Sequence, residues 1–155
     1  MSKTLVLGLG NPILTDDGVG ILVARALQAE LAGRQEVAVA EASVGGLRLL
    51  EVVSGFERVI LADAIQTREG RPGDVYRLTL DSFCASMHSG CSHDLDLFTA
   101  LEFGRQLGMP MPREIVIIAV EVADVITFGE EPTPAVQAAI PRAVEMVRQE
   151  LASAP

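Results

Sequence analysis

The chain has 155 residues, of which 49% are hydrophobic and 21% charged. This length is that of one ordinary domain, and charged residues interrupt the apolar runs too regularly for a membrane span. The formal net charge of −9 disfavours a nucleic-acid partner, because the overall field repels a phosphate backbone.

The N-terminal segment is expected to be a buried strand. It carries one basic residue, Lys3, and then the apolar run TLVLGLG over residues 4–10, which stops at Asn11 and Pro12. A short apolar run that ends at glycine and proline is typical of a strand, and it lacks the long apolar region of a signal peptide. Because the chain has only two cysteines, a reducing cytosol is the expected compartment.

Strands and helices are expected to alternate in the next part of the chain. Apolar residues recur at steps of three and four from Val19 to Leu31, which predicts a helix with one face on a sheet. The same reasoning predicts a strand over residues 37–42, a helix over residues 47–54 and a buried strand over residues 58–65.

One strand in the second half of the chain is expected to run against its neighbours. The segment DVYRLTL, residues 74–80, alternates polar and apolar residues after a turn, as an edge or hairpin strand does. An amphipathic helix is predicted over residues 93–107, a buried strand over residues 114–122 and a closing helix over residues 133–151.

These elements predict an α/β fold of three layers, α/β/α. Its centre is expected to be a mostly parallel twisted sheet of about five strands, one of them antiparallel. In such folds ligands bind beyond the carboxyl ends of the strands. Functional side chains are therefore expected at that edge.

Polar residues fall at these predicted positions: Asp16 and Asp17 after the first strand, Asp63 at the end of VILAD, and His93 at a helix start. Two carboxylates and an imidazole suit a divalent transition metal that keeps positions open for water or substrate. Each residue also has a structural interpretation. Asp16 or Asp17 could cap the first helix, and His93 could start a surface helix, whereas Asp63 is costly to bury without a partner.

A zinc knuckle is an alternative use of the histidine. Ligand types of a structural zinc site occur at Cys84, His88, Cys91 and His93. Their spacing is irregular and includes no C-x-x-C pair, so the signal is weak.

The opening GLGNP has the first two glycines of a dinucleotide-binding loop. Ile13 stands in place of the third glycine, and the loop has no Walker lysine. Nucleotide binding is therefore not expected, and the glycines are expected to let the chain turn sharply.

The segments GLGNPILTDDGVG, VGGLRLL, VILADAI and SHDLDL resemble the hydrogenase maturation protease family, with matches over nearly the whole chain. The resemblance implies one such domain over residues 1–155, with Asp17, Asp63 and His93 as catalytic residues and nickel ligands. Asp17 stands where many members have glutamate, so Asp16 is kept as a substitute for it. Glu41 stands where the family more often has aspartate, and its role is left open.

The resemblance also implies a function. The expected enzyme is an endopeptidase that removes a C-terminal peptide from the precursor of a [NiFe] hydrogenase large subunit after nickel insertion. The nickel is expected to be presented by the substrate, and another divalent metal could replace it in the isolated protein. The enzyme is expected to be a cytoplasmic monomer without a nucleic-acid or membrane partner. Loops such as residues 81–92 are expected to set its specificity.

Two other functions compete with the peptidase. A non-catalytic nickel-binding assembly chaperone could use the same three ligands without hydrolysis. Peptidyl-tRNA hydrolases begin with a similar GLGNPG-like strand end, but Ile13 replaces the glycine here. Their downstream tyrosine and histidine-asparagine pair are also missing, and the acidic charge disfavours tRNA.

Overall fold

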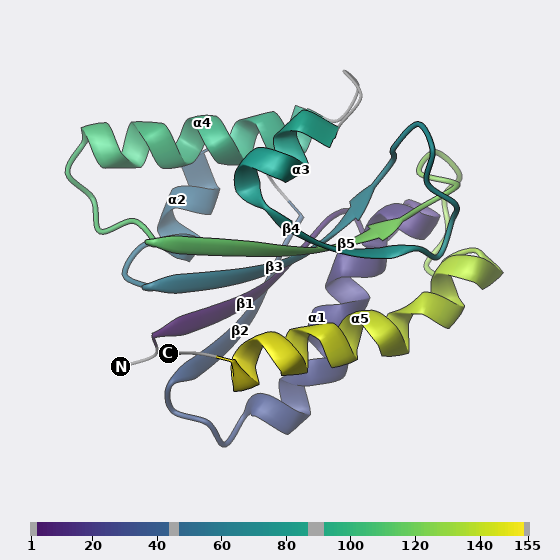
Figure 1. The fold of residues 1–155 in the computed structure, drawn as a ribbon, viewed down its shortest axis with the longest axis horizontal. Helices are drawn as coiled ribbons and strands as arrows, with labels where there is room; N and C mark the ends of the chain where they lie inside the picture. The colour runs from purple at the N-terminus through teal and green to yellow at the C-terminus, as the bar shows by residue number, and fades with distance from the viewer. Residues whose placement is uncertain (1–2, 44–46, 87–91, 154–155) are drawn as a thin grey trace.

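The protein is described by a computed structural model that covers residues 3–43, 47–86 and 92–153. Five strands of this described part form one sheet in the order β2-β1-β3-β5-β4 (Figure 1). They are β1 (Thr4–Leu9), β2 (Val37–Ala42), β3 (Arg58–Ile65), β4 (Val75–Thr79) and β5 (Glu114–Glu121). All neighbours pair in parallel except β4, which is antiparallel to β5. The predicted fold class is confirmed, including the antiparallel edge strand.

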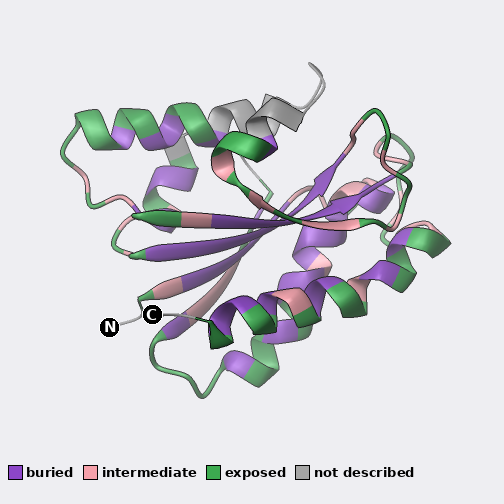
Figure 2. Cartoon of the chain, viewed as in Figure 1, coloured by how far each residue is buried: buried purple, intermediate pink, exposed green. Residues whose placement is uncertain are grey.

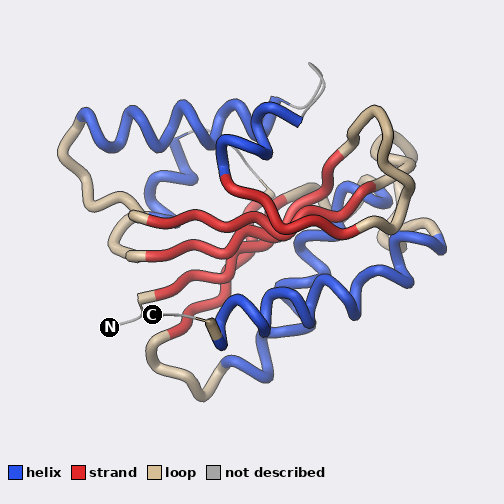
Figure 3. Tube along the Cα trace, viewed as in Figure 1, coloured by secondary structure: helices blue, strands red, loops and turns tan. Residues whose placement is uncertain are grey.

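Helices cover both faces of the sheet, as the three-layer prediction requires (Figure 3). On one face lie α1 (Val19–Leu31) and α5 (Pro134–Ala152). On the other lie α2 (Leu47–Val53), α3 (Leu80–Ser86) and α4 (Ser92–Gln106). Over the described residues, none of these helices has the length and apolarity needed to cross a membrane.

The core is divided in two by the sheet, and the central strands are buried on both sides (Figure 2). All of β3 is buried. Its side chains alternate between the layers, so that Ala62 packs toward α1 and α5 and Leu61 and Ile65 pack toward α4. By this alternation Asp63 shares the face of Leu61 and Ile65.

The expected loop over residues 81–92 is in part a helix. α3 begins at Leu80 immediately after β4, and Thr79 Oγ1 accepts a hydrogen bond from the Ser82 amide (3.2 Å), as an N-cap side chain does. Phe83 anchors the helix because its side chain is fully buried in the core. The loop prediction is therefore wrong for α3, while residues 87–91 lie outside the described part.

A buried ion pair fastens the last helix to the sheet. Glu150 of α5 accepts hydrogen bonds from Arg58 at the start of β3 and from Arg77 of β4. The bond from Arg77 contributes most to lowering the pKa of Glu150, and it outweighs the opposing effect of burial. The network holds α5 across the amino end of the sheet, away from the strand ends where ligands are expected.

Candidate active site

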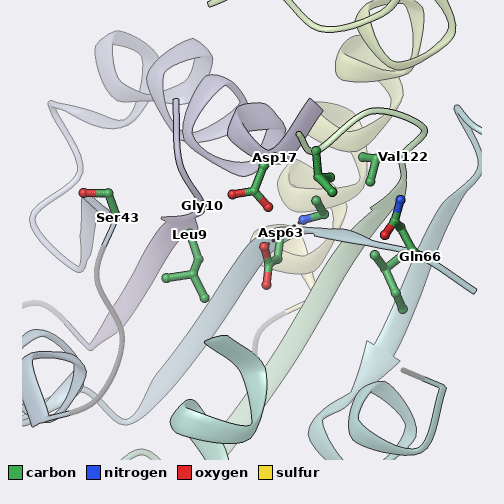
Figure 4. A pocket seen from close by; sticks show the side chains of 10 residues that line it. Leu9, Gly10, Asp17, Ser43, Asp63, Gln66 and Val122 are labelled. Atoms are coloured by element: carbon green, nitrogen blue, oxygen red, sulfur yellow. Dashed lines mark hydrogen bonds between the residues drawn. The ribbon is translucent and has the colours of Figure 1, made fainter. Parts of the chain in front are cut away.

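A pocket lies at the carboxyl ends of β1 and β3, where the parallel topology predicts a ligand site (Figure 4). Its walls come from the ends of these strands and from the loops after β1, β2 and β5. The lining residues are Leu9, Gly10, Asp17, Ser43, Asp63, Ala64, Ile65, Gln66, Val122 and Val125. Two of the predicted site residues, Asp17 and Asp63, are therefore brought together from segments far apart in sequence.

The turn after β1 is built around Asp17. Gly10 has φ 143°, and a Cβ at this position would collide with the Asp17 carbonyl oxygen. The Asn11 amide donates to Asp17 Oδ2 (2.9 Å), and Asn11 Oδ1 accepts from the Ile13 amide (3.1 Å). The glycines thus allow the sharp turn that the sequence predicts, and the asparagine fixes the carboxylate that follows.

Two further glycines bring α1 unusually close to the sheet. A Cβ on Gly20 would collide with the carbonyl oxygen of Ala62 in β3, and a Cβ on Gly8 would lie 2.8 Å from the Ala24 Cβ. Because the short 3-10 helix η1 (Thr15–Gly18) leads directly into α1, this close packing also carries Asp17 toward β3.

Asp63 projects from the point where β3 extends past β1. The pairing between these strands ends at Gly8 and Ala62, whereas β3 stays paired with β5 as far as Ile65. Asp63 is 5% exposed, and its Oδ1 accepts a hydrogen bond from the Ala64 amide (2.8 Å). Its carboxylate faces that of Asp17 across the pocket (Figure 4). Two carboxylates in one pocket attract a cation or share protons with a reacting group.

Asp16 is turned away from this pocket. It is fully buried, and both carboxylate oxygens accept hydrogen bonds. The donors are the Ala123 and Asp124 amides (3.0 Å each) and the Thr133 amide (2.6 Å) and hydroxyl (2.8 Å). Burial by itself raises the pKa of Asp16, but these donors outweigh it and the pKa is lowered.

The helix-cap interpretation of the acidic pair is wrong. α1 begins after Gly18 and has no side-chain cap, and η1 has none either. Asp16 instead ties the turn after β1 to the loop between β5 and α5, which ends at Thr133, the residue before α5.

His93 belongs to the first turn of α4, as predicted for a residue that opens a helix. α4 ends toward the amino edge of the sheet, from which β5 starts, so its first turn lies toward the opposite edge (Figure 1). The side chains of residues 84–96 lie outside the described part, and the approach of His93 to the two carboxylates stays a prediction. The zinc-knuckle residues Cys84, His88 and Cys91 fall in the same undescribed set.

No group of three His, Cys, Asp or Glu side chains suited to a metal occurs among the described side chains, which do not include that of His93. The pair formed by Asp17 and Asp63 supplies oxygen donors that a divalent transition metal accepts. Among the described side chains, this pair is not joined by a third residue of these types.

Other lining residues were not singled out by the sequence. Gln66 and Ser43 follow the ends of β3 and β2, so the rule that ligands bind beyond strand ends could have found them. Val125 is an apolar loop residue and carries no such signal. Glu41, whose role was left open, forms an exposed bidentate ion pair with Arg25 of α1 (2.8 and 3.0 Å).

Comparison with known sequences identifies a protein family. The family model HycI, hydrogenase maturation protease, matches residues 21–150. The Hydrogenase 2 maturation protease of Escherichia coli (strain K12) is 30% identical over 150 residues, which cover 94% of this chain and 88% of that protein.

Two solved structures share the fold and the sequence similarity. The hydrogenase maturating endopeptidase HybD from E. coli is similar with a TM-score of 0.84 and 27% identity, over 98% of this chain and 93% of that chain. The [NiFe] hydrogenase maturation protease HybD from Thermococcus kodakarensis is similar with a TM-score of 0.72 and 26% identity, over 97% of this chain and 99% of that chain.

The family match covers most of the chain and includes the strand that carries Asp63. The resemblance found in the sequence motifs is therefore confirmed, and the sheet topology agrees with that of a solved endopeptidase. The chain belongs to the hydrogenase maturation protease family and is a peptidase.

Proposed function

We propose that this peptidase removes a C-terminal peptide from the precursor of a [NiFe] hydrogenase large subunit after nickel has been inserted. The observation that carries the proposal is the pair Asp17 and Asp63, which face each other in a pocket at the carboxyl edge of the sheet. The names of its relatives, a Hydrogenase 2 maturation protease and a [NiFe] hydrogenase maturation protease, support the choice of substrate.

Asp17, Asp63 and His93 are the proposed site residues. Asp17 is preferred over Asp16 because the oxygens of Asp16 are already used by donors from a distant loop. Two carboxylates and one imidazole form a donor set that nickel, a borderline metal, accepts. The nickel belongs to the substrate in this proposal, so the three side chains recognise it only once it has been inserted.

Hydrolysis requires one water molecule and a group that moves its proton. As the water oxygen adds to the scissile carbonyl carbon, a carboxylate of the pair takes the proton. The C–N bond then breaks and the proton passes to the leaving amine, which yields a new carboxyl terminus and a released peptide. The pocket contributes chiefly by holding the peptide bond beside the carboxylates.

The family match favours this reaction over a peptidyl-tRNA hydrolase. A non-catalytic nickel carrier differs in one respect, because it would bind the precursor and leave it uncut. Action as a monomer in the cytoplasm, without nucleic acid or membrane, completes the proposal. Support comes from the acidic charge and the low cysteine content.

The proposal is tested by mixing the purified protein with nickel-loaded and nickel-free large-subunit precursor and measuring the mass of the product. The wild type should shorten the loaded precursor and leave the nickel-free one intact. Asp63→Asn and His93→Gln should bind but not cleave, because each keeps approximate size while removing a ligand. Intact precursor with bound wild-type protein would instead identify a carrier.

A further inference from the structure

Three large apolar side chains are exposed beside the pocket. Ile126 is 84% exposed, Phe128 80% and Ile13 49%. They come from the loops that follow β5 and β1, and together they are called the apolar patch. A cluster of exposed large apolar residues on a folded domain is characteristic of an interaction surface.

The two loops of the apolar patch are joined along their backbones. Leu14 and Gly129 form a parallel bridge, the Gly129 amide donates to the Ile13 carbonyl (2.9 Å), and the Thr15 amide donates to the Gly129 carbonyl (2.9 Å). One residue earlier in the same parallel register, Ile13 lies beside Phe128. The patch is therefore one surface built from segments more than a hundred residues apart.

The backbone under the apolar patch is held from several sides. Asp124 Oδ1 accepts hydrogen bonds from the Ile126 amide (3.0 Å) and the Thr127 amide (2.9 Å). Buried Asp16 holds the start of the same loop, and the Thr15 hydroxyl donates to the Thr127 carbonyl while Thr15 adopts φ 50°. The apolar side chains thus project outward from a fixed support, and their exposure does not reflect a lack of local structure.

The apolar patch is continuous with the pocket. Val125, the residue before Ile126, lines the pocket together with Asp17 and Asp63. On the other loop, the amide of Asn11 donates to Asp17, two residues before Ile13. A polypeptide whose peptide bond lies between the two carboxylates can therefore extend past Val125 onto the patch.

We propose that the apolar patch binds an apolar segment of the precursor polypeptide that adjoins the peptide bond to be cleaved. This proposal rests on the proposed function. Hydrolysis is faster when the reacting bond is held in place beside the catalytic groups, and an apolar contact close to the pocket supplies such a fixed point. Exposed Glu130 and Glu131 border the patch, so a segment that combines apolar with basic residues is the better match.

The test compares the double variant Ile126→Ser/Phe128→Ser with the control Phe103→Ser/Leu107→Ser. The control residues are also exposed, at 44% and 61%, but they lie near the far end of α4. In cleavage of nickel-loaded precursor, the patch variant should raise KM about tenfold to hundredfold and keep kcat within about twofold. The control should leave both constants unchanged, and all proteins should unfold at the same temperature.

Other outcomes overturn the proposal in distinguishable ways. If the wild type does not cleave the precursor, the proposed function itself fails. If the wild type cleaves and the patch variant keeps its KM, the patch does not bind substrate. A lower kcat at constant KM would assign the loop to positioning of the carboxylates. Loss of a wild-type dimer in sedimentation at unchanged KM would show that a second copy of the chain covers the patch.

Discussion

At the scale of residues, two adjacent aspartates lie in different surroundings. Asp16 holds a distant loop from inside the protein, whereas Asp17 faces the pocket. The sequence motif predicted an acidic pair at a strand end, and the family resemblance favoured Asp17 with Asp16 as its substitute. The donors to Asp16 lie 107 to 117 positions further along the chain, so no local pattern could have revealed them.

Separate replacement of these residues by asparagine should separate stability from activity. In Asp16→Asn, one of the two acceptor oxygens is replaced by an NH2 group, which cannot accept hydrogen bonds from the backbone amides. The variant should therefore lower the free energy of unfolding by about 1–3 kcal/mol. Asp17→Asn can still accept from the Asn11 amide, and it should change stability by less than about 0.5 kcal/mol while losing most precursor cleavage. Urea denaturation and cleavage assays on the same preparations measure both. Equal destabilisation by the two variants would contradict this division.

At the scale of elements, the hydrophobic periodicity was sufficient to predict the strands of the sheet and the helices α1, α2, α4 and α5. The strands β1, β3 and β5 are continuous aliphatic runs because both faces are covered. The helix α3 was not predicted, although α2 is equally short. In α2 the buried side chains of Leu49, Leu50 and Val53 repeat at helical spacing, whereas Phe83 is the one fully buried side chain among those described in α3. A single buried side chain sets no period that a sequence pattern could reveal.

The contact between α1 and the sheet should be sensitive to a single methyl group. Gly20→Ala places a Cβ against the carbonyl oxygens of Leu9 and Ala62. The helix must then shift, which should cost about 1–3 kcal/mol of stability. Because η1 is continuous with α1, Asp17 should move relative to Asp63 and kcat should fall.

Gly33→Ala is the matched control for this change, since nothing lies within 4 Å of a Cβ at Gly33 and its φ is not positive. It should leave the melting temperature and kcat close to those of the wild type. Thermal unfolding and cleavage rates of both variants give the comparison. Wild-type activity in Gly20→Ala would show that the close packing does not position Asp17.

At the scale of the whole molecule, the two ends of the sheet differ: an ion pair holds the last helix at one end, and the candidate active site lies at the other. The pair formed by Arg58 and Glu150 fastens the amino end, and the pocket lies at the carboxyl end. The sequence predicted that the pocket lies at the carboxyl end, because parallel strands place all their carboxyl ends together, but it did not predict the ion pair. The joining of the loops around Gly129 could not be predicted, since it depends on backbone hydrogen bonds between irregular segments.

The stability of the whole protein should depend on pH through Asp16. Its pKa is lowered by folding, below an unfolded value of about 4. The ionised carboxylate therefore stabilises the fold above about pH 4, and this contribution is lost as the pH falls toward the folded pKa. The difference in free energy of unfolding between wild type and Asp16→Asn should be constant from about pH 6 to pH 8 and should shrink below about pH 4. Urea denaturation across this range measures it, and an undiminished difference at about pH 3 would count against the assignment.

The bonds of Asp16 also have a consequence for the order of assembly during synthesis. Every donor that holds Asp16 belongs to residues 123–133, more than a hundred positions after the turn that carries Asp17. A nascent chain that ends before this segment lacks the hydrogen bonds that hold Asp16, even if part of the sheet has already formed. Vectorial synthesis therefore completes the proposed catalytic turn only after residues 123–133 have emerged from the ribosome.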